Sequence, residues 1–435
     1  MSKKLKILAS IIIALLIAAP LFLRTEKEFL EITNFNAAHG VKTRIAKFDS
    51  NGVVYVKCKF KEAGVYHDKA DKFGLSEVVS QLLFRRINNL SREDTTEKLK
   101  NLGIKRLTVS AQGNNFEISF LILKDRASAA LEFLANAFTE PTFSEADLEH
   151  IKEFYPKVLS LEVSSPTALM QEKVDSMLYE NGIYGANPTG TSQTISSITA
   201  EDVSNFIKIK LTHKKLKMIF GGNLTRFDAE SFQKILFEKI SDEDDIDLKQ
   251  GADLKNNLLG RLSKDQLVKI NKPNMTDVVG VMVGIRLDDC DDVEKAAIHI
   301  ISDALFDNVG DFVREFRKNK FSYDISQFFI EKSFSDTIYL TVFIDKNDLE
   351  KYQKFLQKKL KEYSKKINLK ACHESKKCFQ KLTQNGFVDM NGLDGKLKMR
   401  MRPYEKVDDN ILKATAQKIF DKKNMRTVII GNFAE

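Results

Sequence analysis

Lys217–Asn223 reads K-M-I-F-G-G-N, and Arg426–Asn432, at an offset of 209 residues, reads R-T-V-I-I-G-N. Each stretch is a short apolar run that ends in Gly-Asn, which is typical of a buried strand followed by a turn. In both places a segment with apolar residues at helical spacing comes before the strand. Because a domain usually takes about 100–200 residues, this repeat in a chain of 435 residues predicts two copies of one domain.

The sequence around the first copy predicts both strands and helices. Gly52–Phe60 alternates apolar and polar residues, as a strand with one solvated face does, and Phe116–Leu123 is a second strand. Ser144 and Asp147 are suited to cap the last helix of this region. The predicted helices cover Gly74–Asn88, Asp94–Leu102, Asp125–Phe138 and Asp147–Leu161.

The second half repeats this order of elements. Its predicted strands are Val278–Ile285 and Thr337–Ile344, and its predicted helices are Val293–Phe306, Lys346–Ile367 and one that begins at Ala371. Strands in antiparallel blocks mixed with helix pairs predict α+β domains, each a mostly antiparallel sheet packed with helices, rather than a βαβ repeat. The polar, acidic stretch 241–257 is interpreted as a linker between two homologous domains at 29–240 and 258–435.

The N-terminus, residues 1–28, is interpreted as a signal peptide or membrane anchor. Three lysines among the first six residues precede Ile7–Leu23, a run of 17 uncharged and mostly apolar residues, and Arg24 follows it. Ile17-Ala18-Ala19 followed by Pro20 is a poor cleavage site, which favours an uncleaved anchor. We therefore expect the folded part on the periplasmic or cell-envelope side, anchored to the inner membrane or secreted across it.

Composition and charge exclude other classes of protein. The net charge of +8 is carried largely by lysine, and its densest run, Lys354–Lys377, mixes lysine with apolar residues at helical spacing. This pattern indicates a solvated helix face and predicts no nucleic-acid partner. The four cysteines lack C-x-x-C spacing, so neither a disulfide framework nor a cysteine-based metal site is predicted.

Three motifs in the same order resemble the insulinase/pitrilysin family of zinc peptidases. Phe60–Phe84 contains Gly64 after a strand and then the turn Gly74-Leu75-Ser76, where that family begins its zinc-binding helix. Pro141–Glu149 is similar to the family's entry into a long helix, and Gly185–Val203 to its segment H-P-x-G … G-T … I-T-x-E-D-L. The resemblance covers the chain after about residue 48 and implies two domains that form a clamshell.

The resemblance also shows which chemistry this chain has lost. In the active family the inverted motif His-x-x-Glu-His binds zinc, its Glu is the general base, and a Glu on the later long helix completes the site. Here the matching positions are Glu77, Ser80 and Gln81, and the third ligand falls near Val158. The six histidines, at positions 39, 67, 150, 213, 299 and 373, are scattered and form no such motif. We therefore predict that the chain binds no zinc, no other metal and no cofactor.

Active members also use an Arg and a Tyr from another domain to bind substrate and stabilise the oxyanion. The similar segment here is Val313–Ile325, in which Tyr323 stands at the family Tyr position. Arg317 is the better Arg candidate by spacing although one residue short, and Arg314 is the alternative. Arg and Tyr are common residues, so a purely structural role for both is an equal alternative.

The resemblance implies a non-catalytic, zinc-less subunit of an exported peptidase. Its partners would be a zinc-bearing subunit of the same family and a peptide substrate, and Arg317 with Tyr323 would act in the partner's active site. The alternative is a structural scaffold or peptide-binding protein with no proteolytic role. A self-sufficient peptidase would need an unrecognised catalytic site.

Overall fold

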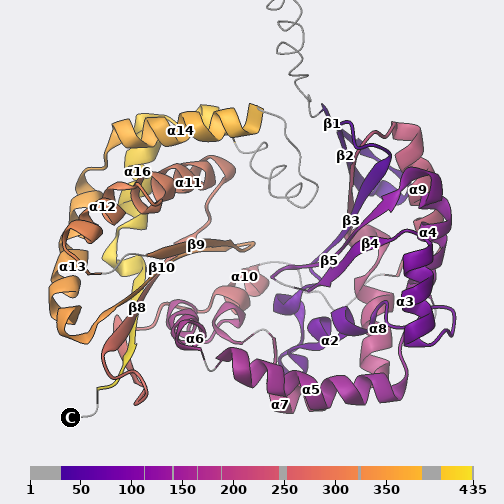
Figure 1. The fold of residues 1–435 in the computed structure, drawn as a ribbon, viewed down its shortest axis with the longest axis horizontal. Coiled ribbons are helices and arrows are strands. Elements are labelled where there is room, and N and C mark those ends of the chain that lie inside the picture. The colour runs from indigo at the N-terminus through magenta and orange to yellow at the C-terminus, as the bar shows by residue number, and fades with distance from the viewer. Residues whose placement is uncertain are drawn as a thin grey trace, which may run out of the picture.

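The computed structural model describes residues 31–111, 113–139, 142–163, 165–187, 189–243, 252–321, 325–384 and 403–433. The chain folds into two halves that face each other like the shells of a clam, each with a sheet and a set of helices (Figure 1). The apolar N-terminal segment Ile7–Leu23 lies outside the described residues. Within the described ranges, no helix is both long and apolar enough to cross a membrane.

The first half contains a six-stranded sheet in the order β1-β2-β6-β3-β5-β4. Its only parallel pair among the described strands is β2 with β6. In chain order the strands are β1 (Glu31–Asn36), β2 (Lys42–Lys47), β3 (Val53–Lys61), β4 (Lys105–Ser110), β5 (Asn115–Leu123) and β6 (Leu216–Gly221).

The second half contains a five-stranded sheet in the order β7-β11-β8-β10-β9. Here β7 and β11 are the parallel pair, and the other described pairings are antiparallel. In chain order the strands are β7 (Leu267–Asn271), β8 (Val278–Asp288), β9 (Ser326–Glu331), β10 (Ser335–Asp345) and β11 (Met425–Gly431).

The two sheets have the same topology apart from the additional strand β1. Both repeated Gly-Asn stretches form the strand that is parallel to one neighbour and antiparallel to the other: β6 lies between β2 and β3, and β11 between β7 and β8. The predicted α+β fold with a duplicated, mostly antiparallel sheet is confirmed.

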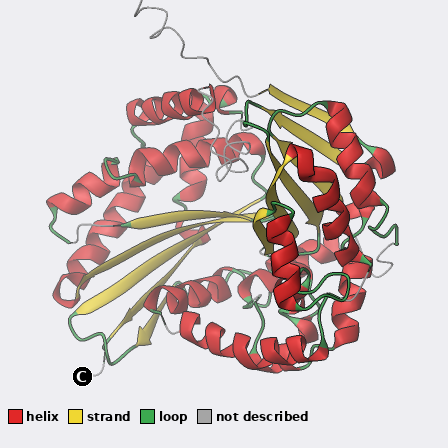
Figure 2. Cartoon of the chain, turned by 45° about the vertical axis from the view of Figure 1, so that its right-hand side comes forward, coloured by secondary structure: helices red, strands yellow, loops and turns green. Residues whose placement is uncertain are grey.

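Helices cover the outer face of each sheet (Figures 1 and 2). The first half contains the helices α2 (Leu75–Leu82), α3 (Arg92–Asn101), α4 (Ala127–Ala135), α5 (Glu145–Val163), α6 (Pro166–Leu178), α7 (Ser192–Ser196), α8 (Ala200–Lys210) and α9 (Arg226–Phe237), of which α6 packs on the second sheet. Those that follow are α10 (Ala252–Leu259), α11 (Asp292–Phe306), α12 (Asp311–Lys318), α13 (Leu349–Lys365), α14 (Leu369–Gln384) and α16 (Asp409–Ile419). Each half has its own apolar core.

A third apolar core joins the halves, because helix α6 of the first half packs on β8 and β11 of the second sheet. Met170, Val174 and Leu178 of α6 are fully buried there. Gly284 of β8 allows this approach, since a Cβ at that position would lie 2.2 Å from Val174 Cγ1. The packing therefore crosses the linker boundary that the sequence suggests, and the residue bounds of the two domains stay a proposal.

Buried charges accompany this core. Arg286 of β8 donates from Nη1 to the carbonyls of Leu178 at 2.8 Å and Leu259 at 3.2 Å, so one guanidinium binds the C-terminal ends of both α6 and α10. A cation at this position suits the partial negative charge of helix C-termini. Its guanidinium carbon also lies 4.9 Å from the centre of the Tyr179 ring.

Lys332, which follows β9, is buried among tyrosines of the first half. Its Nζ lies 4.1 Å from the ring centre of Tyr179 and 5.1 Å from that of Tyr184, and 3.9 Å from an oxygen of Asp175. Burial lowers the pKa of Lys332 to about 8, against the opposing effect of Asp175. The Tyr179 hydroxyl is within hydrogen-bonding distance of the Thr337 hydroxyl at 2.6 Å. These contacts fix the position of one half on the other.

The close approach of α6 to β8 can be tested by a double-mutant cycle. Gly284→Ala should reduce the free energy of unfolding by about 1–3 kcal/mol, because the added methyl overlaps Val174 in a packed core. Val174→Ala alone should also reduce the free energy of unfolding. In combination with Gly284→Ala it should remove the overlap with the added methyl group. Urea denaturation should then show a double variant clearly more stable than the sum of the single effects predicts. Additive effects would contradict this packing.

Candidate functional site

A cavity of about 710 Å³ lies between the two halves, and its lining includes Glu77 and Gln81, two of the predicted zinc-motif positions. The first half contributes residues of α2, α5 and the loop before α2. The second half contributes Ile330 and Glu331 from the end of β9. The lining residues are Val65, Tyr66, Glu77, Gln81, Arg85, Arg92, Gly113, His150, Ile151, Phe154, Tyr155, Thr189, Ile330 and Glu331.

Helix α2 is held at its start by a buried carboxylate. Asp68 accepts hydrogen bonds from the Gly74 amide at 3.2 Å and from the Ser76 hydroxyl at 2.9 Å. Burial raises the pKa of Asp68 to about 7, and these hydrogen bonds act in the opposite direction. Gly74 has a φ of 94°, and a Cβ there would lie 2.7 Å from the Thr189 carbonyl oxygen. The glycine turn and Asp68 together determine which residues of α2 face the cavity.

Glu77 and Gln81, one helical turn apart, both line the cavity. The Gln81 Nε2 donates to Glu77 Oε1 at 3.2 Å, so the side chains at the two predicted histidine positions bind each other. Ser80, at the predicted general-base position, is buried and donates its hydroxyl to the Glu77 carbonyl at 2.8 Å. A serine hydroxyl bonded to its own helix cannot remove a proton from water as a carboxylate does.

Helix α5 supplies the opposite wall. His150, Ile151, Phe154 and Tyr155 line the cavity, and the His150 ring stacks on Phe154 with centroids 6.0 Å apart. Val158 lies in α5, but its side chain is outside the described residues, so its assignment as the third ligand position stays a prediction. His150 was treated as one of the scattered histidines. The recurrence of 150, 151, 154 and 155 on one helix face is the signal that could have placed it here.

The base of α5 is tied to the chain that follows α2. Asp147 pairs with Arg85 Nε at 2.9 Å and with Arg86 Nε at 2.6 Å. Burial alone would raise the pKa of Asp147, but hydrogen bonds from Ser144 and Arg86 hold this pKa well below its usual range. The Ser144 amide and hydroxyl both donate to this carboxylate, which confirms the predicted capped start of α5. The ion pairs fix the distance between the two walls of the cavity.

The side chains that line the cleft determine which ligands it can bind. Among the described residues, no trio of His, Cys, Asp or Glu side chains in this cleft lies close enough to hold a metal ion. Arginines, glutamates and aromatic side chains do line it and can contact a bound peptide.

The two candidate arginines lie on α12 of the second half and do not line this cavity. Arg317 Nη1 donates to the Asn308 carbonyl at 2.7 Å, and Arg314 pairs with Asp311. Both arginines are exposed. Tyr323 is outside the described residues, so its pairing with either arginine stays a prediction.

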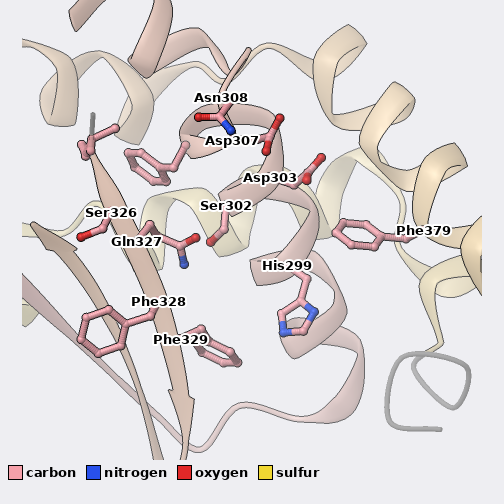
Figure 3. Close-up of a pocket in the computed structure, with 12 residues that line it drawn as sticks. His299, Ser302, Asp303, Asp307, Asn308, Ser326, Gln327, Phe328, Phe329 and Phe379 are labelled. Carbon is pink, nitrogen blue, oxygen red and sulfur yellow. The ribbon is translucent and has the colours of Figure 1, made fainter. Parts of the chain in front are cut away.

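A second cavity, of about 530 Å³, lies between α11 and β9, next to this segment (Figure 3). Asp307 and Asn308 lie at the end of α11, and Ser326 and Gln327 come from β9. Asn308 connects Arg317 to this cavity through its carbonyl. The two cavities share no lining residue.

The comparison with protein families confirms the resemblance for the part of the chain that holds the cleft. Residues 51–191, which include α2 and α5, match the insulinase family, peptidase family M16. The uncharacterized zinc protease YmxG of Bacillus subtilis (strain 168) is 19% identical over 162 residues. That match covers 37% of this chain and only 39% of the relative.

Solved structures share the fold over nearly the whole chain. The peptidase M16 inactive domain from Pseudomonas fluorescens superposes with a TM-score of 0.79 at 17% identity, over 93% of this chain and 98% of that one. A protease from Helicobacter pylori gives 0.76 at 14% identity, over 92% and 100%. The periplasmic protease PqqL from Escherichia coli gives 0.71 at 10% identity, over 93% of this chain but 48% of PqqL. At these identities the likeness establishes the two-domain α+β fold.

The loss of zinc chemistry can be tested by restoring the two histidine positions. Glu77→His with Gln81→His places imidazoles at i and i+4 on the helix face that lines the cleft, the spacing that binds zinc in peptidases of this type. Bound zinc, measured by elemental analysis after equilibration with zinc, should rise by about one ion per chain relative to the parent. Glu77→His alone is the control and should add less. Equal zinc in the parent and the double variant would contradict the placement of the site.

Proposed function

We propose that this protein is the zinc-less subunit of an exported insulinase-like peptidase, in which it shapes the substrate chamber for a zinc-bearing partner. The observation that carries the proposal is the cleft itself. It keeps a cavity of about 710 Å³ between the halves, yet carries Glu77, Ser80 and Gln81 where the family has its zinc motif. A cavity with peptide-binding groups and no activating group fits a subunit that positions substrate for chemistry elsewhere.

The solved relatives support pairing with a second chain of the same fold. This chain spans about half the length of PqqL, a periplasmic protease, so that protease holds about twice the length of chain. The Pseudomonas fluorescens relative is described as an inactive domain of the same peptidase family. We therefore propose a heterodimer with a zinc-bearing family member, located in the periplasm and held at the membrane by Ile7–Leu23.

In this proposal Arg317 and Tyr323 act in the partner's active site. Arg317 is exposed on α12, in the half that does not carry the zinc-motif helix, and is thus accessible to another chain. Its contact with the Asn308 carbonyl positions the guanidinium beside the second cavity. A guanidinium there could bind a substrate carbonyl and stabilise the oxyanion that a zinc-bound water generates. The resemblance assigns the same role to the Tyr323 hydroxyl.

A scaffold without proteolytic function is the alternative, and one observation favours it. Both candidate arginines already have acceptors within their own half, because Arg314 pairs with Asp311 and Arg317 binds Asn308. An oxyanion donor must be preorganised but available. Only measurements on the mixed complex separate the two functions.

Substitutions of the Arg/Tyr segment test the proposed role. Peptide hydrolysis would be measured for this chain mixed with a zinc-bearing family member of the same organism. Tyr323→Phe and Arg317→Ala should each lower turnover by about 10²-fold or more, because each removes a transition-state donor. Association, followed by light scattering, should not change. Arg314→Ala tests the rival assignment.

Arg226→Ala is the matched control, since Arg226 is an exposed arginine on α9 that pairs with Glu230 and lies over the Phe35 ring, outside both cavities. It should leave turnover unchanged. The scaffold function replaces the proposal if no zinc-bearing partner binds. It also replaces the proposal if substitution of Arg317, Arg314 and Tyr323 leaves turnover unchanged in every case.

A further inference from the structure

We propose that His39, His213 and Asp242 form a binding site for a divalent transition metal of the zinc type, on the first half and outside the cleft. The candidate ligand atoms of these three residues all lie within 4.8 Å of one another. Two imidazole nitrogens and a carboxylate oxygen are ligands that zinc prefers, whereas magnesium and calcium prefer oxygen ligands alone. The inference does not depend on the proposed peptidase function.

The parallel pairing of β2 with β6 brings the two histidines together. In this pair Lys42 lies opposite Lys217, so the turns that precede the two strands are neighbours. His39 lies in the turn between β1 and β2, and His213 lies in the short 3-10 helix before β6. Residues 174 positions apart in the chain thus become neighbours at one end of the sheet.

The third ligand is fixed by a backbone contact. The His213 amide donates to the Ser241 carbonyl at 3.1 Å, and Thr212 forms an isolated bridge with Ser241. Asp242 follows directly, where the chain leaves the first half. A metal ion bound here would therefore link the segment at Asp242, where the chain leaves the first half, to the turn between β1 and β2.

Both imidazole rings present Nδ1 to the same carboxylate oxygen. His213 Nδ1 lies 2.6 Å from Asp242 Oδ1, and His39 Nδ1 lies 3.4 Å from it. The two rings stack with centroids 4.1 Å apart. The Phe237 ring meets both nearly perpendicularly, at 4.9 Å from His213 and 5.6 Å from His39. One ion bound by all three residues would need Asp242 to move outward and one of the two stacked rings to turn, because the lone pair of each Nδ1 lies in the plane of its ring.

The site is buried on one side and open on the other. The side chain of His213 is 2% exposed, while those of His39 and Asp242 are 41% and 64% exposed. A cavity of about 500 Å³ adjoins His39, and Glu230 and Glu238 line it. An ion can therefore reach the site from solvent. Water can occupy the coordination positions that the protein leaves open, as in zinc sites with three protein ligands, and the two glutamates lie nearby.

One feature of the cluster limits the expected affinity. The second ring nitrogen of His213, Nε2, is buried without a hydrogen-bond partner among the described residues. Histidines that bind metals through one nitrogen usually donate the other N–H to an acceptor, and loss of that support typically costs about 10–100-fold in affinity. We therefore expect a site that binds zinc stoichiometrically but releases it to a strong chelator.

Metal titration of the untagged full chain tests the proposal. Isothermal titration with zinc chloride after chelator treatment should show one site per chain, and cobalt(II) should give the visible absorption of a low-symmetry complex. His39→Gln and Asp242→Asn should each weaken binding by at least about tenfold, since each removes one of three protein ligands. Both residues are partly exposed, so these variants should fold; circular dichroism checks this.

His373→Gln is the matched control. His373 pairs with Asp409 at 2.7 Å and has no second histidine nearby among the described residues, so this substitution should leave metal binding unchanged. A chain that binds no zinc, or one whose zinc site is unaffected by both His39→Gln and Asp242→Asn, would overturn the proposal.

Discussion

The packing of α6 against the sheet of the opposite half is the constraint on which the rest of the structure depends. Val174 and Leu178 pack over Gly284 and Met170 over Gly280, and each such buried side chain stabilises the fold by about 1.5–3 kcal/mol. Lys332, enclosed by tyrosines and paired with Asp175, adds a contact that is costly to break, because removal of one partner leaves a buried charge unpaired. The halves therefore act as one unit.

The cleft is a consequence of this fixed arrangement. Lys332 directly follows Glu331, and Tyr66 lies close to Lys332, so two lining residues of the cavity belong to or border the buried junction. The junction bounds the cavity whichever side chains stand at Glu77, Ser80 and Gln81. Residues that pack the junction and residues that face the cavity are largely different, so the walls of the cavity do not depend on the chemistry of its lining.

Sequence patterns predicted the strands and helices with strong periodicity, such as β5 and α11, almost to their ends. The helix expected to reach Asn88 ends at Leu82, because tertiary contacts of Arg85 and Arg86 with Asp147 replace further helical turns. Strands β1 and β2 are not among the elements predicted from the sequence, although both lie within the predicted first domain. Nothing local showed that α6 packs on the other sheet, or that the pairing of β2 with β6 brings His39 to His213. Such contacts depend on topology rather than on local pattern.

The central claim is that the cleft of this chain does not hold the family's zinc. The most direct measurement is anomalous diffraction at the zinc absorption edge from crystals of the protein equilibrated with zinc. The account predicts no anomalous peak among Glu77, Gln81 and His150. A well-occupied peak coordinated by these side chains would contradict it, because the chain would then possess a metal centre of its own in the cleft.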